Sequence, residues 1–305
     1  MRFPEFLIIG AMKSGTTSLY FDLRSNPAIY LPEDKEPGNL TRDEVLTEDG
    51  RAVYARHFRK ARKEQLCGDA STTYSKLPEI TGVPRRARRL LGNEVKVLYL
   101  VREPVSRTLS HHYHELTAGT VPANVDQAVR EHPRLIQFSL YARQIRPWIE
   151  SFGADRVRII RFEDFVRDRR GIVATISDFL GVEPRWGNVD ADRIHNASEL
   201  AAAPRGLAWR FSRGSAYRAL IRPWLSSPVR LRIGRLLMPK APSRPAPPTL
   251  ETVDHIIERV RDDASALRGI VGSDEPLWDL DAVRRSFLAG EPERSSRPNS
   301  TGAKK

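Results

Sequence analysis

The chain has 305 residues, of which 40% are hydrophobic and 29% charged, and its formal net charge is +12. This composition is typical of a globular protein with a sizeable core, and it excludes a fibrous or wholly disordered chain. No apolar run approaches the roughly 20 residues that a membrane span needs. The single cysteine, Cys67, excludes an internal disulfide and disfavours a structural zinc site. We therefore expect a cytoplasmic protein with one domain over residues 1–290 and a disordered tail over 291–305.

The predicted elements alternate between strands and helices along the chain. A short buried strand at residues 6–9 leads through a glycine-containing loop into a helix over 16–24. Further strands are expected at 66–67, 95–101 and 156–162, and helices at 135–152, 172–180 and 250–270. This alternation predicts an α/β fold, a single P-loop-like domain with a central, mainly parallel sheet flanked by helices. In such a sheet, ligands bind at the carboxyl ends of the strands.

The loop after the first strand, residues 10–18, has the sequence GAMKSGTTS. Its backbone N–H groups and the N-terminus of the following helix form an anion cradle, to which Lys13 adds a positive charge. In the Walker pattern a Lys follows the second Gly, whereas here Thr16 follows Gly15 and the Lys comes earlier. The loop alone is compatible with a phosphate site or with an ordinary tight turn before a helix.

A second basic group follows the strand at residues 95–101. Arg102 stands at the end of this strand, and Ser110 comes eight residues later on the expected helix, whose first turn accommodates Pro104. A guanidinium fork suits a phosphate dianion, and a serine hydroxyl adds one donor. These two residues therefore predict a second phosphate site.

The two motifs together resemble the sulfotransferases that use 3′-phosphoadenosine 5′-phosphosulfate, especially a branch related to carbohydrate and heparan sulfate sulfotransferases. The resemblance continues through residues 26–37, 68–74, 161–165, 176–181 and 277–278. It implies that the first loop holds the 5′-phosphosulfate of the donor and that the second pair holds its 3′-phosphate. The implied donor-binding residues are Lys13, Ser14, Gly15, Thr16, Thr17, Ser18, Arg102 and Ser110. The product would be adenosine 3′,5′-bisphosphate, and no metal is expected.

Sulfuryl transfer needs alignment of the reactants, stabilisation of the leaving phosphate and a base for the acceptor hydroxyl. Lys13 is placed to meet the leaving-group charge. The resemblance implies that Glu36 is the base, with Lys35 orienting it or contacting the transferred sulfonate. A solvated Glu36 paired with Lys35 is the structural alternative. The rival bases are His111, His112 and His114, which lie on the expected helix after Ser110.

Five other residues near these motifs have structural interpretations. Asp69 and Ser71 either line the site or cap the following turn. Tyr141 and Trp148 have helical spacing that indicates core packing rather than a nucleotide platform. Cys67 is interpreted as a packing residue.

The segment from residue 204 to 248 is strongly basic. It contains nine Arg residues and Lys240, and no Asp or Glu. Apolar and Arg residues alternate there at near-helical spacing, which is typical of a basic amphipathic helix. Such a helix could contact a membrane surface or bind an acidic acceptor such as a glycan or lipid head group. The structural alternative is an ordinary core helix whose Arg residues face solvent. No nucleic-acid-binding module is recognisable.

Three functions are compatible with these motifs. The first is a sulfotransferase acting on the hydroxyl or amine of a glycan, lipid or secondary metabolite. The second is a P-loop nucleotide kinase or other phosphotransferase, which the displaced Lys13 disfavours. The third is a non-catalytic nucleotide-binding protein at a membrane surface, which the full set of Lys13, Glu36, Arg102 and Ser110 disfavours.

Overall fold

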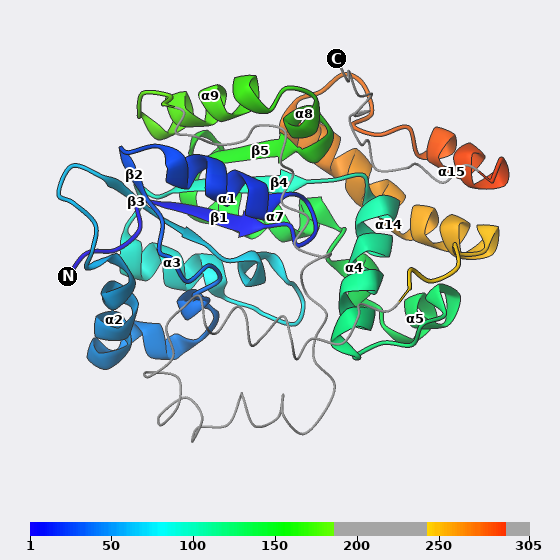
Figure 1. Cartoon of the computed structure of the whole chain (residues 1–305), viewed down its shortest axis with the longest axis horizontal. Helices are drawn as coiled ribbons and strands as arrows, with labels where there is room; N and C mark the ends of the chain where they lie inside the picture. The colour runs from blue at the N-terminus through cyan, green and yellow to red at the C-terminus, as the bar shows by residue number, and fades with distance from the viewer. Residues whose placement is uncertain (186–242, 291–305) are drawn as a thin grey trace, which may run out of the picture.

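The computed structural model describes residues 1–185 and 243–290, and its centre is a parallel sheet (Figure 1). The strand order is β2-β3-β1-β4-β5, and every neighbouring pair is parallel. The strands are β1 (Phe6–Gly10), β2 (Ile29–Tyr30), β3 (Leu66–Ala70), β4 (Lys96–Val101) and β5 (Val157–Arg161). The predicted α/β class with a parallel sheet is therefore confirmed.

Helices cover both faces of this sheet. Those before the gap are α1 (Thr16–Ser25), α2 (Glu48–Ala55), α3 (Val83–Leu91), α4 (Pro104–Ala118), α5 (Val125–Glu131), α6 (Arg134–Gln137), α7 (Tyr141–Phe152), α8 (Phe162–Arg167) and α9 (Arg169–Leu180). After the gap come α14 (Leu250–Val271) and α15 (Leu280–Leu288). Short 3₁₀ helices are η1 (Asn39–Thr41), η2 (Asp43–Leu46), η3 (Arg56–Phe58), η4 (Thr72–Ser75) and η5 (Ala154–Arg156).

The strand side chains alternate between two hydrophobic clusters. In β1, Phe6 and Ile8 pack with α1, α8 and α9, whereas Leu7 and Ile9 pack with α3, α4, α7 and α14. Because both faces are covered, the strand is apolar throughout, as parallel strands usually are. Burying a side chain of this size contributes about 1.5–3 kcal/mol. The sheet is therefore a rigid base for the loops at its carboxyl edge.

Two elements of the structure differ from the sequence prediction. The sequence analysis missed β2, whose two residues are too few to show a periodic pattern. The helix expected over 135–152 is two helices, α6 and α7, separated at residues 138–140. Ser139 lies in this break, where its hydroxyl accepts a hydrogen bond from the Arg107 guanidinium at 2.5 Å. The break thus places a polar group against a buried cation.

Residues 204–242 of the basic segment and the tail 291–305 lie outside the described residues. Among the described residues, no helix is both long and apolar enough to cross a membrane. Figure 1 shows α4 and α14 at the end of the sheet toward which β1 runs. The loops that follow β1, β3, β4 and β5 meet at this edge, because all of these strands are parallel.

Candidate active site

The loop between β1 and α1 has an unusual backbone. Gly15 has φ +87° and Lys13 has φ +73°, so both adopt left-handed conformations. The N-terminus of α1 has no side-chain cap and no acidic residue in its first turn. The hydroxyl of Ser14 is buried and has no hydrogen-bond partner among the described residues. Free N–H groups, a helix N-terminus and an unsatisfied hydroxyl at one place fit an anionic group such as a phosphate.

The ammonium group of Lys13 lies in a positively charged environment. Burial lowers its pKa to about 8, with further contributions from the charges of Arg102, Arg107 and Lys35, in that order. The charges of these three cations therefore all oppose the charged form of Lys13. A bound anion would relieve both the repulsion and the desolvation.

The ring of Phe162 contacts both predicted phosphate sites. The guanidinium carbon of Arg102 lies 4.9 Å from the ring centroid. A Cβ atom on Gly15 would lie 2.7 Å from the same ring. Nη1 of Arg102 also donates a hydrogen bond to the carbonyl of Lys13 at 3.4 Å. The two basic residues are therefore on the same edge of the sheet, as a single ligand with two phosphate groups requires.

The backbone around Arg102 is held by residues far away in the sequence. The hydroxyl of Tyr141 donates to the Arg102 carbonyl at 2.7 Å. The N–H of Glu103 donates to Glu163 Oε1 at 2.7 Å, and the indole N–H of Trp278 donates to Glu163 Oε2 at 3.1 Å. The end of β4 is therefore fixed by α7, by α8 and by the segment before α15.

Glu36 follows Lys35 in the loop beyond β2, with φ +66°. Its Oε2 accepts a hydrogen bond from the Thr72 N–H at 2.7 Å, and its Oε1 accepts one from Lys35 Nζ at 2.8 Å. The Glu36 side chain is 35% exposed, so the carboxylate is held and still reachable. This contact fits both an orienting role for Lys35 and a Glu36 that is only paired with Lys35, so the parts of both residues in the reaction stay predictions.

Lys13 and Glu36 share a backbone feature. In residues 1–185 and 243–290 they are the two non-glycine residues with a positive φ. This conformation costs about 1–2 kcal/mol for a residue with a Cβ atom. Strain of this kind concentrates at functional sites, where the surrounding structure maintains it. The backbone thus singles out the two residues to which the sequence analysis assigns the chemistry.

A buried carboxylate supports the loop that carries Glu36. Asp69 accepts hydrogen bonds from the hydroxyls of Tyr54 and Tyr74, both at 2.6 Å, and from Ser71 at 2.8 Å. The Ser71 oxygen in turn accepts the N–H of Gly38 at 3.0 Å. Burial raises the pKa of Asp69. Asp69 and Ser71 therefore act behind the site and do not line it.

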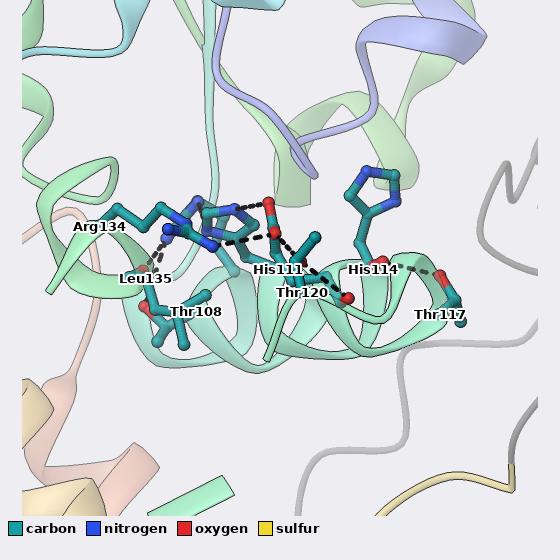
Figure 2. A network of polar contacts seen from close by, with 9 residues as sticks. Thr108, His111, His114, Thr117, Thr120, Arg134 and Leu135 are labelled. Atoms are coloured by element: carbon teal, nitrogen blue, oxygen red, sulfur yellow. Dashed lines mark hydrogen bonds and ion pairs between the residues drawn. The ribbon is translucent and has the colours of Figure 1, made fainter. Parts of the chain in front are cut away.

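The three candidate histidines have different surroundings. The His111 ring lies between Arg107 and Glu115, at 3.4 and 3.3 Å (Figure 2). Burial lowers the pKa of His111 to about 3, so the ring is neutral, accepts from Arg107 through Nδ1 and donates to Glu115 through Nε2. His112 Nε2 donates to the Pro122 carbonyl at 2.9 Å. Both rings are buried, which argues against their acting as the base.

His114 projects from α4 away from that network (Figure 2). Burial lowers the pKa of His114, and the positive charge of Lys13 lowers it further. Of the three candidates, His114 is therefore the histidine whose pKa is lowered by the charge of Lys13 in the first loop. Ser110 is half-buried in the second turn of α4, and its part in phosphate binding stays a prediction.

The remaining interpretations concern the core. Tyr141, Trp148 and Cys67 are buried, as expected, although the Tyr141 hydroxyl also holds Arg102. Burial raises the pKa of the Cys67 thiol to about 11. Among the described residues there is no group of three or more His, Cys, Asp or Glu side chains arranged to hold a metal ion.

A family model described as the sulfotransferase domain matches residues 3–201. The chain belongs to this family. Heparan sulfate glucosamine 3-O-sulfotransferase 3B1 of Mus musculus is 26% identical over 191 residues, which cover 60% of this chain and 47% of the relative. Heparan sulfate glucosamine 3-O-sulfotransferase 6 of Homo sapiens is 26% identical over 190 residues, 60% of this chain and 53% of the relative. This chain thus spans about half the length of these curated relatives.

A solved structure supports the fold. The sulfotransferase from Alicyclobacillus acidocaldarius superposes with a TM-score of 0.62 at 22% identity, covering 93% of this chain and 100% of that chain. At this identity the likeness concerns the fold. The P-loop-like arrangement expected from the sequence is therefore confirmed.

The sequence analysis missed the residues that support the site. Phe162, Glu163 and Trp278 belong to segments that carry the resemblance, but their spacing along the chain gave no sign of contact with Arg102 or its neighbour. Thr72 was likewise not assigned, although it holds Glu36. Each of these residues lies in a short sequence motif that, taken alone, indicates no chemical role.

Replacing Gly15 by Ala should disturb both the loop and its contact with Phe162. The added Cβ combines a left-handed backbone with a contact of 2.7 Å, so we expect a lower melting temperature and a loss of affinity for adenosine 3′,5′-bisphosphate. Gly272→Ala is the matched control, because Gly272 has φ +73° and no atom within 4 Å of the added Cβ. It should lower the melting temperature without changing nucleotide affinity. Equal nucleotide affinity in both variants would contradict this account.

Nucleotide binding should weaken as the pH rises through about 8, because Lys13 then loses its charge. Because the pKa of Lys13 is lowered, its ammonium loses the proton, and with it the positive charge, at a lower pH than an ordinary lysine does. Lys13→Arg keeps its charge over this range, so the decline should move to higher pH. Isothermal titration calorimetry with adenosine 3′,5′-bisphosphate measures both profiles. If the affinity of Lys13→Arg fell over the same pH range as that of the wild type, the titrating group would be a residue other than Lys13.

Proposed function

We propose that this sulfotransferase moves a sulfuryl group from 3′-phosphoadenosine 5′-phosphosulfate to a hydroxyl group of an acceptor. The same reaction with an amine in place of the hydroxyl group is included in the proposal. The proposed donor-binding residues are those of the loop 13–18 together with Arg102 and Ser110. Glu36 is the proposed base, and Lys13 the proposed group that stabilises the leaving phosphate.

In the proposed step, the acceptor oxygen forms a bond to sulfur while the bond between sulfur and the bridging phosphate oxygen breaks. The acceptor proton moves to the Glu36 carboxylate. The electron pair of the broken bond remains on the phosphate of adenosine 3′,5′-bisphosphate, next to the Lys13 ammonium. Positioning and charge stabilisation supply most of the rate in displacements of this kind.

The observation that carries this proposal is the contact of Phe162 with both Gly15 and Arg102. It supports one ligand with two separate phosphate groups at a single sheet edge. The effect of the Lys35 charge on the pKa of Lys13 and the Lys35–Glu36 ion pair support a position of Glu36 on the phosphosulfate side of that ligand. Sulfuryl transfer needs a base on that side, beside the cation that meets the leaving group.

The acceptor class is proposed from the relatives. Their names refer to heparan sulfate glucosamine, which makes a glycan hydroxyl the first class to assay, before lipids and secondary metabolites. The basic segment 204–248 is proposed to contact the acceptor or a membrane surface. Most of that segment lies outside the described residues.

The nucleotide specificity tests the proposal directly. Adenosine 3′,5′-bisphosphate should raise the melting temperature, and ATP with magnesium should not. Arg102→Ala should weaken the bisphosphate by about tenfold to a hundredfold, since hydrogen bonds to charged groups contribute about 1.5–3 kcal/mol. Arg85→Ala, at an exposed position of α3, is the control and should bind normally. Stabilisation by ATP with magnesium alone would favour a phosphotransferase.

Glu36→Gln should lower turnover by about 10²–10⁴-fold, the usual contribution of a general base. The variant keeps the size of the side chain, so the affinity for adenosine 3′,5′-bisphosphate should stay within about twofold. Glu33→Gln, at an exposed position of the same loop, should have normal turnover. Transfer of radiolabelled sulfate to extracted acceptors measures the rates. Normal turnover in Glu36→Gln would move the base assignment to His114.

A further inference from the structure

Lys76 lies at the carboxyl edge of the sheet and has no assigned role. It directly follows η4, whose first residue, Thr72, holds Glu36. Burial lowers the pKa of Lys76. Its Nζ lies 5.6 Å from the centroid of the Phe138 ring. The ammonium is thus partly withdrawn from water and packs against an aromatic face.

No counter-ion accompanies this ammonium in the part of the chain that the structure describes. Among residues 1–185 and 243–290, no carboxylate lies within 4.0 Å of Lys76 Nζ, whereas the other ion pairs near the site fall within that distance. Glu36 and Glu115 are the first two negative charges that raise the pKa of Lys76, so it lies near both. A partly buried cation without a hydrogen-bonded anion is unfavourable.

Both neighbouring carboxylates already have partners. Glu36 binds Lys35 and Thr72. Glu115 accepts hydrogen bonds from His111 and Arg134, and a short one from Thr120 (Figure 2). Among the described residues, neither carboxylate pairs with Lys76 by direct contact.

His114 connects Lys76 to the first loop. The charges of both Lys13 and Lys76 lower the pKa of His114, so the ring lies near both lysines. Figure 2 shows this ring apart from the hydrogen-bonded group that includes His111 and Arg134. Lys13, His114 and Lys76 come from three different segments, and Lys76 directly follows the 3₁₀ helix whose Thr72 holds Glu36. The charge of the two lysines favours an anion beside the base.

We propose that Lys76 binds an anionic substituent of the acceptor, a carboxylate or a sulfate ester close to the hydroxyl that Glu36 deprotonates. This inference rests on the proposed sulfuryl transfer, which places the acceptor at Glu36. The anion supplies the counter-charge that Lys76 lacks among the described residues. Lys76 is then a specificity-determining residue that selects acidic acceptors over neutral ones of the same shape.

The test uses the full chain saturated with adenosine 3′,5′-bisphosphate, so that the donor phosphate sites are filled. Methyl β-glucuronide and methyl β-glucoside are the probes, since they differ by a carboxylate, and inorganic sulfate at constant ionic strength is the minimal anion. Isothermal titration calorimetry should show that the wild type binds the glucuronide at least about tenfold more tightly than the glucoside, a single charge-pair effect. Sulfate should compete with the glucuronide.

The variants assign this preference to one side chain. Lys76→Met keeps the apolar stem and should abolish the preference, Lys76→Arg should restore most of it, and Lys60→Met, at an exposed position, should leave it unchanged. A preference that persists in Lys76→Met, or a wild type that binds neither the glucuronide nor sulfate, would overturn the inference. Failure of the proposed function is a separate result, because the wild type would then not bind adenosine 3′,5′-bisphosphate.

Discussion

The Phe162 ring lies against both Gly15 of the first loop and Arg102 at the end of β4, the residues of the two proposed phosphate sites. Phe162 is the first residue of α8, directly after β5, so the sheet determines where its ring stands. The backbone of Arg102 is fixed through the hydroxyl of Tyr141. Gly15 and Arg102, which are far apart in the sequence, thereby become parts of one rigid surface.

The site stores unfavourable energy in the protein without its ligand. Lys13 lies near other cations, and both Lys13 and Glu36 have a positive φ. The sheet and the buried hydrogen bonds around Asp69 maintain this arrangement. Because the groups are already in place, the proposed reaction would need little reorganisation as charge develops on its leaving phosphate.

The sequence predicted the parts of the structure that depend on local pattern. Four of the five strands, the loop before α1 and the position of Pro104 followed from periodicity, glycine and proline. The residues that hold the end of β4 could not be found in this way, because Tyr141 and Trp278 reach it only through the tertiary fold. The break before α7 also escaped prediction, since its Ser139 binds the buried Arg107 from another helix.

Helix α2 supplies no group to the proposed reaction, yet its Tyr54 hydroxyl is one of the donors that hold Asp69. Through Ser71 and Gly38, this hydrogen bond reaches the turn next to Glu36. Exchanging the segment between β2 and β3 would therefore also disturb the support of Glu36. Successful redesign of that segment has to retain a tyrosine at the position of Tyr54.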